Sequence, residues 1–596
     1  MTQRTKDLIK VKRQQHLERV QDSLSNSPKS FWSYHKHIIR NKNSPSSNTY
    51  NNVTATTPNK KAELFNEYFA SVFLPKSSTN YTKLVCMNPK TSEEISSIEI
   101  SECEVEHYLN NLDTSKAYGP DGIPPRLLKE CSKEISSSLC SLFNKSIETG
   151  RVPREWKKAN VIPIHKKDCV EPVTNYRPIS LLPVVSKVLE RCVFNNIYPF
   201  IRVLINNVQH GFLRNRSCVT QLLGVLHDIG KSLDNNRQVD VLYLDFSKAF
   251  DSVDHAILLQ KLQLHGINGS LLRWFDSYLN DRQQRVVIEG AASSWSPVSS
   301  GVPQGSILGP LLFVIFINDL PDNLSSTTNS ALYADDSKLY SEIRSVDNCQ
   351  SLQEDLTMLE NWCTKSRMNF NVGKCKVLTV TRKRKPINFP YRVHGNELSS
   401  CKAEKDLGLL VSSDLKWGPH ILKTVAKANK MLGLLKRSCF EITNTQVRRT
   451  LYMTLVRSQL TYGCEVWYPS SRQLSLKIEG VQRRATLWIL MKNRGELSYV
   501  ERLRRLNLIP LVYDREQKDL IFYYKCKNNM IDLDVEQYVE TTSTRTRAGT
   551  SQLLRSQACK TTTFQSSYFV RIVNLWNYVC KTAPSNSFNT LSSFKT

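Results

Sequence analysis

The most constraining feature of this sequence is a set of aspartates at the ends of predicted strands. Residues 239–246, Val-Asp-Val-Leu-Tyr-Leu-Asp-Phe, predict a buried strand that ends in the carboxylate of Asp245. Residues 330–340 predict two short strands around a turn, with Asp335 and Asp336 at the tip. An acidic turn that lies beside another acidic strand end repels it unless a cation is present. This pattern favours a metal site over the alternative of an ordinary solvated Asp-Asp turn.

Carboxylates arranged in this way suit nucleotidyl transfer. Metal ions activate an attacking hydroxyl group and neutralise the charge of a leaving pyrophosphate. Magnesium prefers oxygen ligands, usually a couple of carboxylates together with substrate phosphates. The chain also contains 81 Lys and Arg residues against 54 Asp and Glu, a formal net charge of +27. Such an excess favours a polyanionic partner but does not by itself indicate catalysis.

Composition excludes several other classes. The hydrophobic fraction of 40% is enough for substantial cores. The 16 cysteines include no Cys-x-x-Cys pair, which argues against a zinc finger, and no signal peptide is evident, which fits a reducing compartment and a protein that is not secreted. The longest apolar run, Leu308–Ile317, is about half a membrane span, so we expect a buried element and no membrane partner.

The patterning divides the chain into four parts. Residues 1–100 predict a basic helical N-terminal extension, with a linker rich in Ser, Asn, Thr and Pro near residues 41–60. Residues 101–400 mix helical patterns with short β-branched strands, which predicts an α+β domain. Residues 401–445 include a basic helix from Trp417 onward, and residues 446–596 predict a basic, mostly helical region.

Several segments resemble the motifs of reverse transcriptases from non-LTR retrotransposons of the jockey and LINE type. Tyr333-Ala334-Asp335-Asp336 resembles the YxDD signature, and residues 245–251 resemble the first catalytic motif. The other motif-like segments, in the same order as in that family, are Asn175–Leu181, Gln209–Ser217 and Gly301–Pro310. Residues 462–467 resemble the region that follows the thumb in jockey-type elements. The order of these segments makes coincidence a poor explanation.

The resemblance implies a right-hand polymerase of the α+β class. Fingers and an antiparallel-sheet palm would occupy residues 101–400, and a primer-grip hairpin and helical thumb would occupy residues 401–445. The implied activity is that of an RNA-directed DNA polymerase, which extends a DNA 3′-end on an RNA template with deoxynucleoside triphosphates. Its implied cofactors are two Mg²⁺ ions, with Mn²⁺ as an alternative. An element ribonucleoprotein would occupy the nucleus and the cytoplasm.

The same resemblance implies roles for individual residues. Asp245 and Asp335 would bridge both metal ions, the backbone carbonyl of Phe246 would supply a further ligand, and Asp336 would be the less essential carboxylate. Phe250 would be the steric gate that rejects a 2′-hydroxyl, although an ordinary core phenylalanine is the alternative.

Other residues would bind the nucleotide. Gln304 and Gly305 would approach the incoming nucleotide and the template, whereas a simple turn before a helix explains the glycine but not the glutamine. Arg177 would clamp the triphosphate, because a guanidinium group matches phosphate geometry. Lys166 or Lys167 would assist it, and the sequence does not favour one over the other. Lys374 would neutralise pyrophosphate, with a surface lysine as the alternative.

The implied thumb carries a basic stripe at near-helical spacing, alongside apolar residues. Its members are Lys423, Lys427, Lys430 and Arg437. Lysines are sufficient for contact with a nucleic-acid backbone that is not read for sequence, and a solvated helix face is the alternative. Leu407-Gly408, within residues 404–409, resembles the short primer-grip hairpin motif.

Two rival hypotheses remain open at this point. A group II intron-type maturase would share the palm, but the jockey-like segment after Tyr462 argues against it. A truncated or domesticated element copy would bind RNA without catalysis, and the intact aspartates argue against decay. Because the motifs begin near residue 119, we also expect the chain to lack the N-terminal endonuclease of full-length elements.

Overall fold

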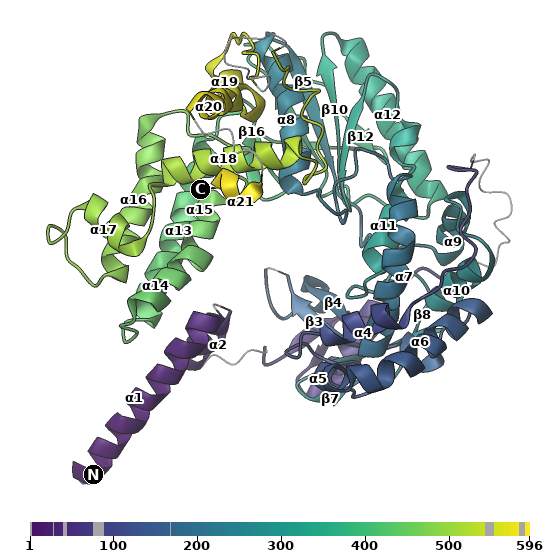
Figure 1. Cartoon of the computed structure of the whole chain (residues 1–596). Helices are drawn as coiled ribbons and strands as arrows, with labels where there is room; N and C mark the ends of the chain where they lie inside the picture. The colour runs from purple at the N-terminus through teal and green to yellow at the C-terminus, as the bar shows by residue number, and fades with distance from the viewer. Residues whose placement is uncertain are drawn as a thin grey trace.

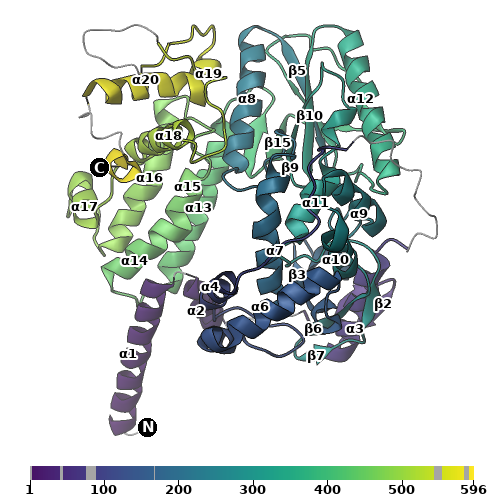
Figure 2. The same ribbon diagram turned by 45° about the vertical axis from the view of Figure 1, so that its right-hand side comes forward.

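The computed structural model describes residues 3–27, 29–39, 45–75, 89–166, 168–542, 553–582 and 590–595. Helices and two larger sheets are mixed along the chain, which confirms the predicted α+β class. In both ribbon views the helices α13, α14 and α16 lie on one side of the molecule, and the helices α9–α12 lie on the other (Figure 1, Figure 2). No helix in the described ranges is long and apolar enough to cross a membrane.

The central sheet has the strand order β14-β11-β5-β10-β9. Its strands are β5 (Gln238–Leu244), β9 (Asn329–Tyr333), β10 (Asp336–Ile343), β11 (Lys376–Val380) and β14 (Ser399–Ser400). The middle strand β5 pairs antiparallel with both β10 and β11. Its side chains alternate between two apolar clusters, with Val239 and Val241 in one and Leu242 and Leu244 in the other. Because both faces are covered, the strand is nearly continuously apolar, as the sequence predicts.

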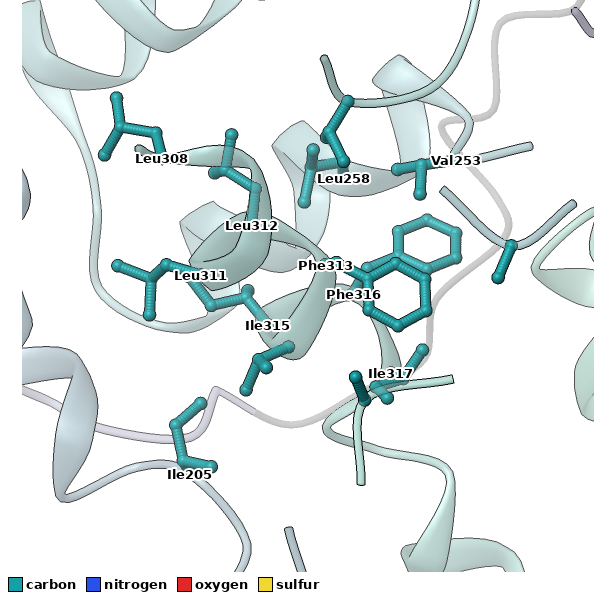
Figure 3. Packing of buried hydrophobic residues seen from close by; sticks show 14 of the residues in the cluster. Ile205, Val253, Leu258, Leu308, Leu311, Leu312, Phe313, Ile315, Phe316 and Ile317 are labelled. Atoms are coloured by element: carbon teal, nitrogen blue, oxygen red, sulfur yellow. The ribbon is translucent and has the colours of Figure 1, made fainter. Parts of the chain in front are cut away.

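Helices cover both faces of the central sheet. Those that contribute to the clusters are α7 (Val184–Arg202), α8 (Cys218–Asp234), α9 (His255–Leu264), α10 (Gly269–Leu279), α11 (Gly309–Ile317) and α12 (Val346–Lys365). The apolar run 308–317 forms α11, and its side chains pack into the larger cluster against Val253, Leu258 and Ile205 (Figure 3). The prediction of a buried element there is confirmed.

A second sheet, which we call the outer sheet, has the order β4-β3-β6-β7, and β8 also pairs with β6. Its strands are β3 (Lys158–His165), β4 (Tyr176–Leu181), β6 (Arg282–Ile288), β7 (Ala291–Ala292) and β8 (Ser296–Val298). Helix α3 (Pro58–Ser71) packs on it through Phe65, which is fully buried beside Val161 and Val286. Helices α4 (Glu102–Asn110), α5 (Pro125–Glu130) and α6 (Ser132–Thr149) pack against one another nearby.

The predicted linker near residues 41–60 is wrong from residue 48 onward. Residues 41–44 lie outside the described ranges, but β1 (Asn48–Tyr50) and β2 (Val53–Ala55) form a hairpin and α3 follows directly. The Thr49 amide donates to the Glu171 carbonyl at 2.9 Å, and Asn48 is fully buried. The polar composition of this segment is typical of a linker. In the fold, however, its polar groups bond to a segment that is distant in the sequence, and local composition does not report such a partner.

The predicted N-terminal extension is therefore divided between two parts of the fold. Helices α1 (Gln3–Asn26) and α2 (Ser30–Ile39) pack on the C-terminal helices, where His35 Nδ1 lies 2.8 Å from Ser438 Oγ and Phe31 is fully buried. The β1–β2 hairpin and α3 belong to the outer sheet instead. The first part of α1 extends away from the body in both views (Figure 1, Figure 2).

The C-terminal part begins with a short hairpin and continues as helices. The hairpin is formed by β15 (Ala403–Asp406) and β16 (Leu409–Ser412), and the following α13 (Gly418–Ser438) is the predicted basic helix. We call the remainder the C-terminal helical region: α14 (Thr445–Leu451), a π-helical turn (Tyr452–Arg457), α15 (Ser458–Thr461), α16 (Arg472–Ile489), α17 (Tyr499–Leu506), α18 (Leu511–Lys527), α19 (Thr562–Gln565), α20 (Tyr568–Thr582) and α21 (Leu591–Lys595). It shares one apolar cluster with α13 and α2.

Candidate active site

The register of the central sheet places the three predicted catalytic aspartates together where β5 ends and β10 begins. We call this end of the strands the carboxylate edge, or sheet edge. β5 pairs with β10 so that Leu244 lies opposite Ser337, and Asp245 and Asp336 come one residue beyond that pair. The hairpin of β9 and β10 closes with Asp336 paired to Tyr333, which leaves Ala334 and Asp335 as its two turn residues. The two strands around an acidic turn that the sequence predicts are therefore present.

The turn that carries Asp335 has a strained backbone. Ala334 has φ of 56°, in the left-handed region that residues with a side chain rarely adopt. The backbone of Gly211 packs directly against it, since a Cβ atom added to Gly211 would lie 2.3 Å from the Ala334 nitrogen. A conformation of this kind persists only where surrounding groups hold it, and such positions are often functional.

The carboxylates affect one another electrostatically. Burial raises the pKa of Asp335 above its ordinary value, and the negative charge of Asp245 raises it further. Desolvation and the charges of Asp335 and Asp245 raise the pKa of Asp336 to about 6. The Asp336 side chain is exposed, so the neighbouring charges are the more effective of these causes. The edge of the sheet thus concentrates negative charge.

The donor set fits a metal that is shared with a phosphate-bearing substrate. Within the described ranges, no group of three or more His, Cys, Asp or Glu side chains could hold a metal ion by itself. Magnesium in phosphoryl-transfer sites usually takes one or two carboxylates and completes its coordination with substrate phosphates and water. The oxygen ligands of Asp245 and Asp335 match that requirement, and their mutual repulsion favours a cation.

The backbone of Phe246 is available to this edge. Phe246 forms a bridge with Phe370 in which the flanking residues make the hydrogen bonds: Ser247 N to Asn369 O at 2.8 Å and Asn371 N to Asp245 O at 2.7 Å. In this kind of antiparallel pair the intervening carbonyl points away from its partner strand. It therefore points toward the side of β10, while the Phe246 ring is buried and stacks on Phe370.

Lys374 lies directly at the site. Its Nζ atom is 2.8 Å from Asp245 Oδ2, and its side chain is exposed. An exposed lysine can exchange this carboxylate for another anion at small cost, because exposed ion pairs are weak. Lys374 therefore lies beside one of the predicted catalytic carboxylates, and its predicted role towards pyrophosphate stays a prediction.

The predicted steric gate, Phe250, is partly buried. It stacks on Phe313 of α11 with ring centroids 4.5 Å apart and an interplanar angle of 15°. Phe212 contacts it edge-on at 5.9 Å. Phe212 is an exposed aromatic with φ of 59°, so a second strained residue adjoins the site. Phe212 lies within the motif-like segment 209–217, to which the resemblance assigned no role for this residue.

The loop that contains Gln304 and Gly305 approaches the same region. Gln304 Nε2 donates to Asp251 Oδ1 at 2.9 Å, and the Ser180 amide donates to the Gln304 carbonyl at 2.8 Å. Gly305 has φ of 134°, and a Cβ atom there would lie 2.5 Å from the Ser180 carbonyl oxygen. Only glycine fits so close a backbone approach. The loop is also held by the buried Glu190, whose carboxylate accepts from the Ile307 amide at 2.7 Å.

Arg177 lies on β4 with an exposed side chain. Its positive charge lowers the pKa of Asp335 against the dominant effect of burial, so the guanidinium lies within electrostatic range of that carboxylate. Burial, and then the charge of Arg177, lower the pKa of Lys166. Lys166 therefore lies within electrostatic range of Arg177, whereas Lys167 lies outside the described residues.

The hairpin predicted as a primer grip is anchored beside the carboxylates. Leu407 and Gly408 form its turn, with φ of 42° and 92°. Lys338 of β10 forms a buried ion pair with Asp406 in this hairpin. The Tyr462 hydroxyl donates to the Leu407 carbonyl at 2.9 Å, which adds a residue of the C-terminal helical region that sequence reasoning did not assign.

The basic stripe is exposed as predicted. Lys423, Lys427, Lys430 and Arg437 all lie on α13 with exposed side chains. Their successive spacings of four, three and seven residues place them on one face of the helix. Along the chain, the β15–β16 hairpin lies between this helix and the strands that carry the carboxylates.

Residues 164–405 match a family model described as reverse transcriptase (RNA-dependent DNA polymerase). The chain is 28% identical over 403 residues to the probable RNA-directed DNA polymerase from transposon BS of Drosophila melanogaster, a match that covers 64% of this chain and 44% of that protein. It is 29% identical over 374 residues to the RNA-directed DNA polymerase from mobile element jockey of the same species, with coverage of 61% and 39%.

A third relative is the probable RNA-directed DNA polymerase from transposon X-element of Drosophila melanogaster. It is 29% identical over 395 residues, which are 64% of this chain and 43% of that protein. The chain thus spans less than half the length of these relatives. The resemblance to non-LTR retrotransposon enzymes of the jockey type, inferred above from the motifs, is confirmed.

Proposed function

We propose that this chain, whose residues 164–405 carry a reverse transcriptase domain, is an RNA-directed DNA polymerase of a non-LTR retrotransposon. It would extend a DNA 3′-end with deoxynucleotides on an RNA template. The observation that carries the proposal is the position of Asp245 beside the Asp335–Asp336 turn on adjacent antiparallel strands. The alternative of an RNA-binding protein without catalysis does not account for carboxylates held together in a strained turn.

The parts of a right-hand polymerase correspond to the observed elements. We assign the palm to the central sheet with α7–α12 and the fingers to the outer sheet with α3–α6. We assign the primer grip to the β15–β16 hairpin and the thumb to α13. Compared with the sequence-based domains, this moves residues 48–75 from the N-terminal extension to the fingers, because they pack on β6.

The proposed mechanism uses two carboxylates at the sheet edge. Asp245 and Asp335 would hold two Mg²⁺ ions with help from the Phe246 carbonyl, and Asp336 would contribute less because it is the most exposed of the three. Such ions, or Mn²⁺ in their place, activate the primer 3′-hydroxyl and stabilise charge on the pyrophosphate. Lys374 would exchange Asp245 for the pyrophosphate oxygens, which an exposed ammonium can do readily.

The nucleotide would lie between β4 and the catalytic turn. Arg177 lies within electrostatic range of Asp335 and of Lys166, and its guanidinium would bind the triphosphate with help from Lys166. Gly305 lets its loop approach Ser180 closely, and Gln304 would contact the incoming base pair. Phe250, fixed by Phe313, would lie under the deoxyribose and exclude a 2′-hydroxyl.

The nucleic acid would run from the carboxylates along α13. The lysines of its exposed stripe would contact duplex phosphates, which need charge but no sequence recognition. Partners are therefore an RNA template, a DNA primer or target, and deoxynucleoside triphosphates. We also propose that such an enzyme acts as a ribonucleoprotein in the nucleus and cytoplasm.

The test is incorporation of deoxynucleotides on a primed RNA template with magnesium by the purified chain. The control is the double variant Asp335→Ala, Asp336→Ala, whose fold is checked by circular dichroism. We expect synthesis by the parent and none by the variant. A folded parent that binds RNA but makes no DNA would refute the proposal in favour of an RNA-binding copy of an element.

A further inference from the structure

The segment before α8 runs beside the strand that leads to the catalytic turn. Gln209 forms a parallel bridge with Leu332 of β9. The His210 amide donates to the Leu332 carbonyl at 2.9 Å, and the Leu332 amide donates to the Val208 carbonyl at 3.0 Å. This segment therefore lies alongside β9, the outer strand of the central sheet, next to the residues that precede Asp335.

The side chain of Gln209 holds the turn itself. Its Oε1 atom accepts from the Ala334 amide at 2.9 Å and from the Gly211 amide at 2.7 Å. The residue is 1% exposed, so both bonds lie away from solvent. Ala334 is the residue with φ of 56°, and Asp335 follows it directly. A buried acceptor is thus fixed on the strained peptide that presents the catalytic carboxylate.

The backbone of Gln209 is held in turn by Arg216. Arg216 Nη1 donates to the Gln209 carbonyl at 2.8 Å and to the Asn207 carbonyl at 2.6 Å. The Arg216 side chain is only 7% exposed, so it has few alternatives in water. A guanidinium group suits this task because its donors lie in a rigid plane.

The charge of Arg216 is balanced by a residue of the C-terminal helical region. Arg216 Nε donates to Asp532 Oδ2 at 3.0 Å, and Arg202 forms a second ion pair with the same carboxylate. The Asp532 amide donates to the Asn215 carbonyl at 3.0 Å. Burial alone would raise the pKa of Asp532, but the two guanidinium groups outweigh it and hold the pKa below its ordinary value.

We infer that Asp532, Arg216 and Gln209 form a positioning relay through which the C-terminal helical region sets the turn that carries Asp335. The three are positioning residues, since none of them faces the reacting groups. The relay rests on the proposed function for its effect on catalysis. Its structural part, the restraint of the Ala334 amide, does not depend on that function.

Loss of the relay has a defined consequence. Without Asp532, Arg216 keeps a buried charge with one partner fewer and shifts toward other acceptors, which loosens Asn207 and Gln209. Without the Gln209 acceptor, Ala334 relaxes toward an ordinary φ and Asp335 leaves its position beside Asp245. Nucleotide and RNA binding by other residues would continue.

The direct test is hydrogen–deuterium exchange of the full chain over residues 329–343, without metal or nucleic acid. We expect faster exchange of the Ala334 amide in Gln209→Met and, to a smaller extent, in Asp532→Asn. The matched control is Asp534→Asn, which removes the same charge two residues away. The Asp534 carboxylate accepts from the Glu536 amide within its own loop and is exposed.

The kinetic test separates positioning from folding and binding. We expect Asp532→Asn to lower kcat about tenfold, the effect of one lost hydrogen bond at the site, with KM for deoxynucleotides and affinity for RNA unchanged. The magnesium concentration for half-maximal rate should rise. Combining Asp532→Asn with Gln209→Met should cost less than the two changes added together, because both act on one turn.

The outcomes are distinct from those of the proposed function. Equal exchange at Ala334 in Asp532→Asn and Asp534→Asn would overturn the relay even if the enzyme is active. A rise in KM with kcat unchanged would overturn it as well, and so would full additivity in the double variant. An inactive parent would refute the polymerase, whereas the exchange experiment would still decide whether the turn is held from Asp532.

Discussion

The edge of the central sheet and the C-terminal helical region treat acidic side chains in opposite ways. In the helical region the nearly fully buried Asp519 receives two hydrogen bonds of 3.0 Å from Arg571, and Asp514 is paired with Arg457 at 3.0 Å. At the sheet edge Asp335 and Asp336 lie together, and among the described residues neither forms an ion pair with a lysine or arginine. The third carboxylate, Asp245, pairs with the exposed Lys374 at 2.8 Å, and exposed ion pairs are weak.

This difference separates structural charges from functional ones. A buried carboxylate that serves the fold needs a partner, because removing one member of a buried pair is strongly destabilising. Carboxylates that bind a substrate or metal must stay available, and the fold accepts their repulsion. Burial raises the pKa values of Asp335 and Asp336, and the negative charge of Asp245 raises both of them further.

The largest expected effect is on catalysis at the sheet edge. Asp335→Asn should reduce deoxynucleotide incorporation by at least about a hundredfold, because a ligand for charge stabilisation in the transition state is lost. Asp336→Asn should reduce it less, since Asp336 is the more exposed carboxylate. Steady-state incorporation on a primed RNA template measures both. Neither change should lower the urea midpoint of unfolding, and a lower midpoint would mean that these acids stabilise the fold.

The reverse result is expected in the helical region. Asp519→Ala should lower the free energy of unfolding by about 3–5 kcal/mol, because it leaves the Arg571 charge buried without its carboxylate. Urea unfolding followed by tryptophan fluorescence measures the change. Replacing both members, Asp519→Leu with Arg571→Met, should restore part of the loss. Equal stability of the single variant and the parent would show that the Asp519–Arg571 pair does not stabilise the fold.

A smaller effect concerns Asp251, which supports Gln304. Burial raises its pKa to about 6, and the hydrogen bond from Gln304 lowers it only in part. Because the folded-state pKa lies above the unfolded value, the ionised form costs stability above pH 6, and this cost disappears as the pH falls toward about 4. Asp251→Asn should therefore be more stable than the parent by about 1–2 kcal/mol at pH 7.5, after allowance for partial exposure.

The measurement is the free energy of unfolding of parent and Asp251→Asn at pH 7.5 and pH 4.5. The difference between the two proteins should shrink at the lower pH. A difference that is the same at both pH values would show that the pKa of Asp251 is not raised in the folded protein.

The smallest effect is expected on the α13 stripe. Lys427→Ala should reduce the slope of log affinity against log salt by about 1, because one phosphate contact is lost. Fluorescence anisotropy with an RNA–DNA duplex at several salt concentrations gives this slope. The control is Lys145→Ala, an exposed lysine on α6 that is paired with Glu148 at 2.9 Å. Equal slopes for the two variants would argue that α13 is only a solvated face.

Local pattern was sufficient to predict the elements that carry the catalytic acids. The apolar run before Asp245 and the strand residues around Asp335 have the periodicities of a buried strand and a hairpin, and both are present. The order of the motifs also predicted the family. These features depend on residues close together in the sequence, so no tertiary information was needed.

Other features depend on partners that are distant in the sequence. The polar segment that includes Asn48 appeared to be a linker because its bonding partner, Glu171, belongs to another part of the chain. The same is true of Tyr462, which reaches the Leu407 carbonyl, and of Asp532, which reaches Arg216. A composition pattern cannot report such contacts.

The sequence by itself thus determined which acids the protein has for chemistry and on which strand ends they stand, because strand and turn preferences are local. Only the tertiary structure decided how those acids are held. The Ala334 conformation is unfavourable for an isolated turn, and it persists because Gln209 and Gly211 pack against it from a segment far away in the chain. Local preferences cannot specify a strained conformation whose stability comes entirely from its neighbours.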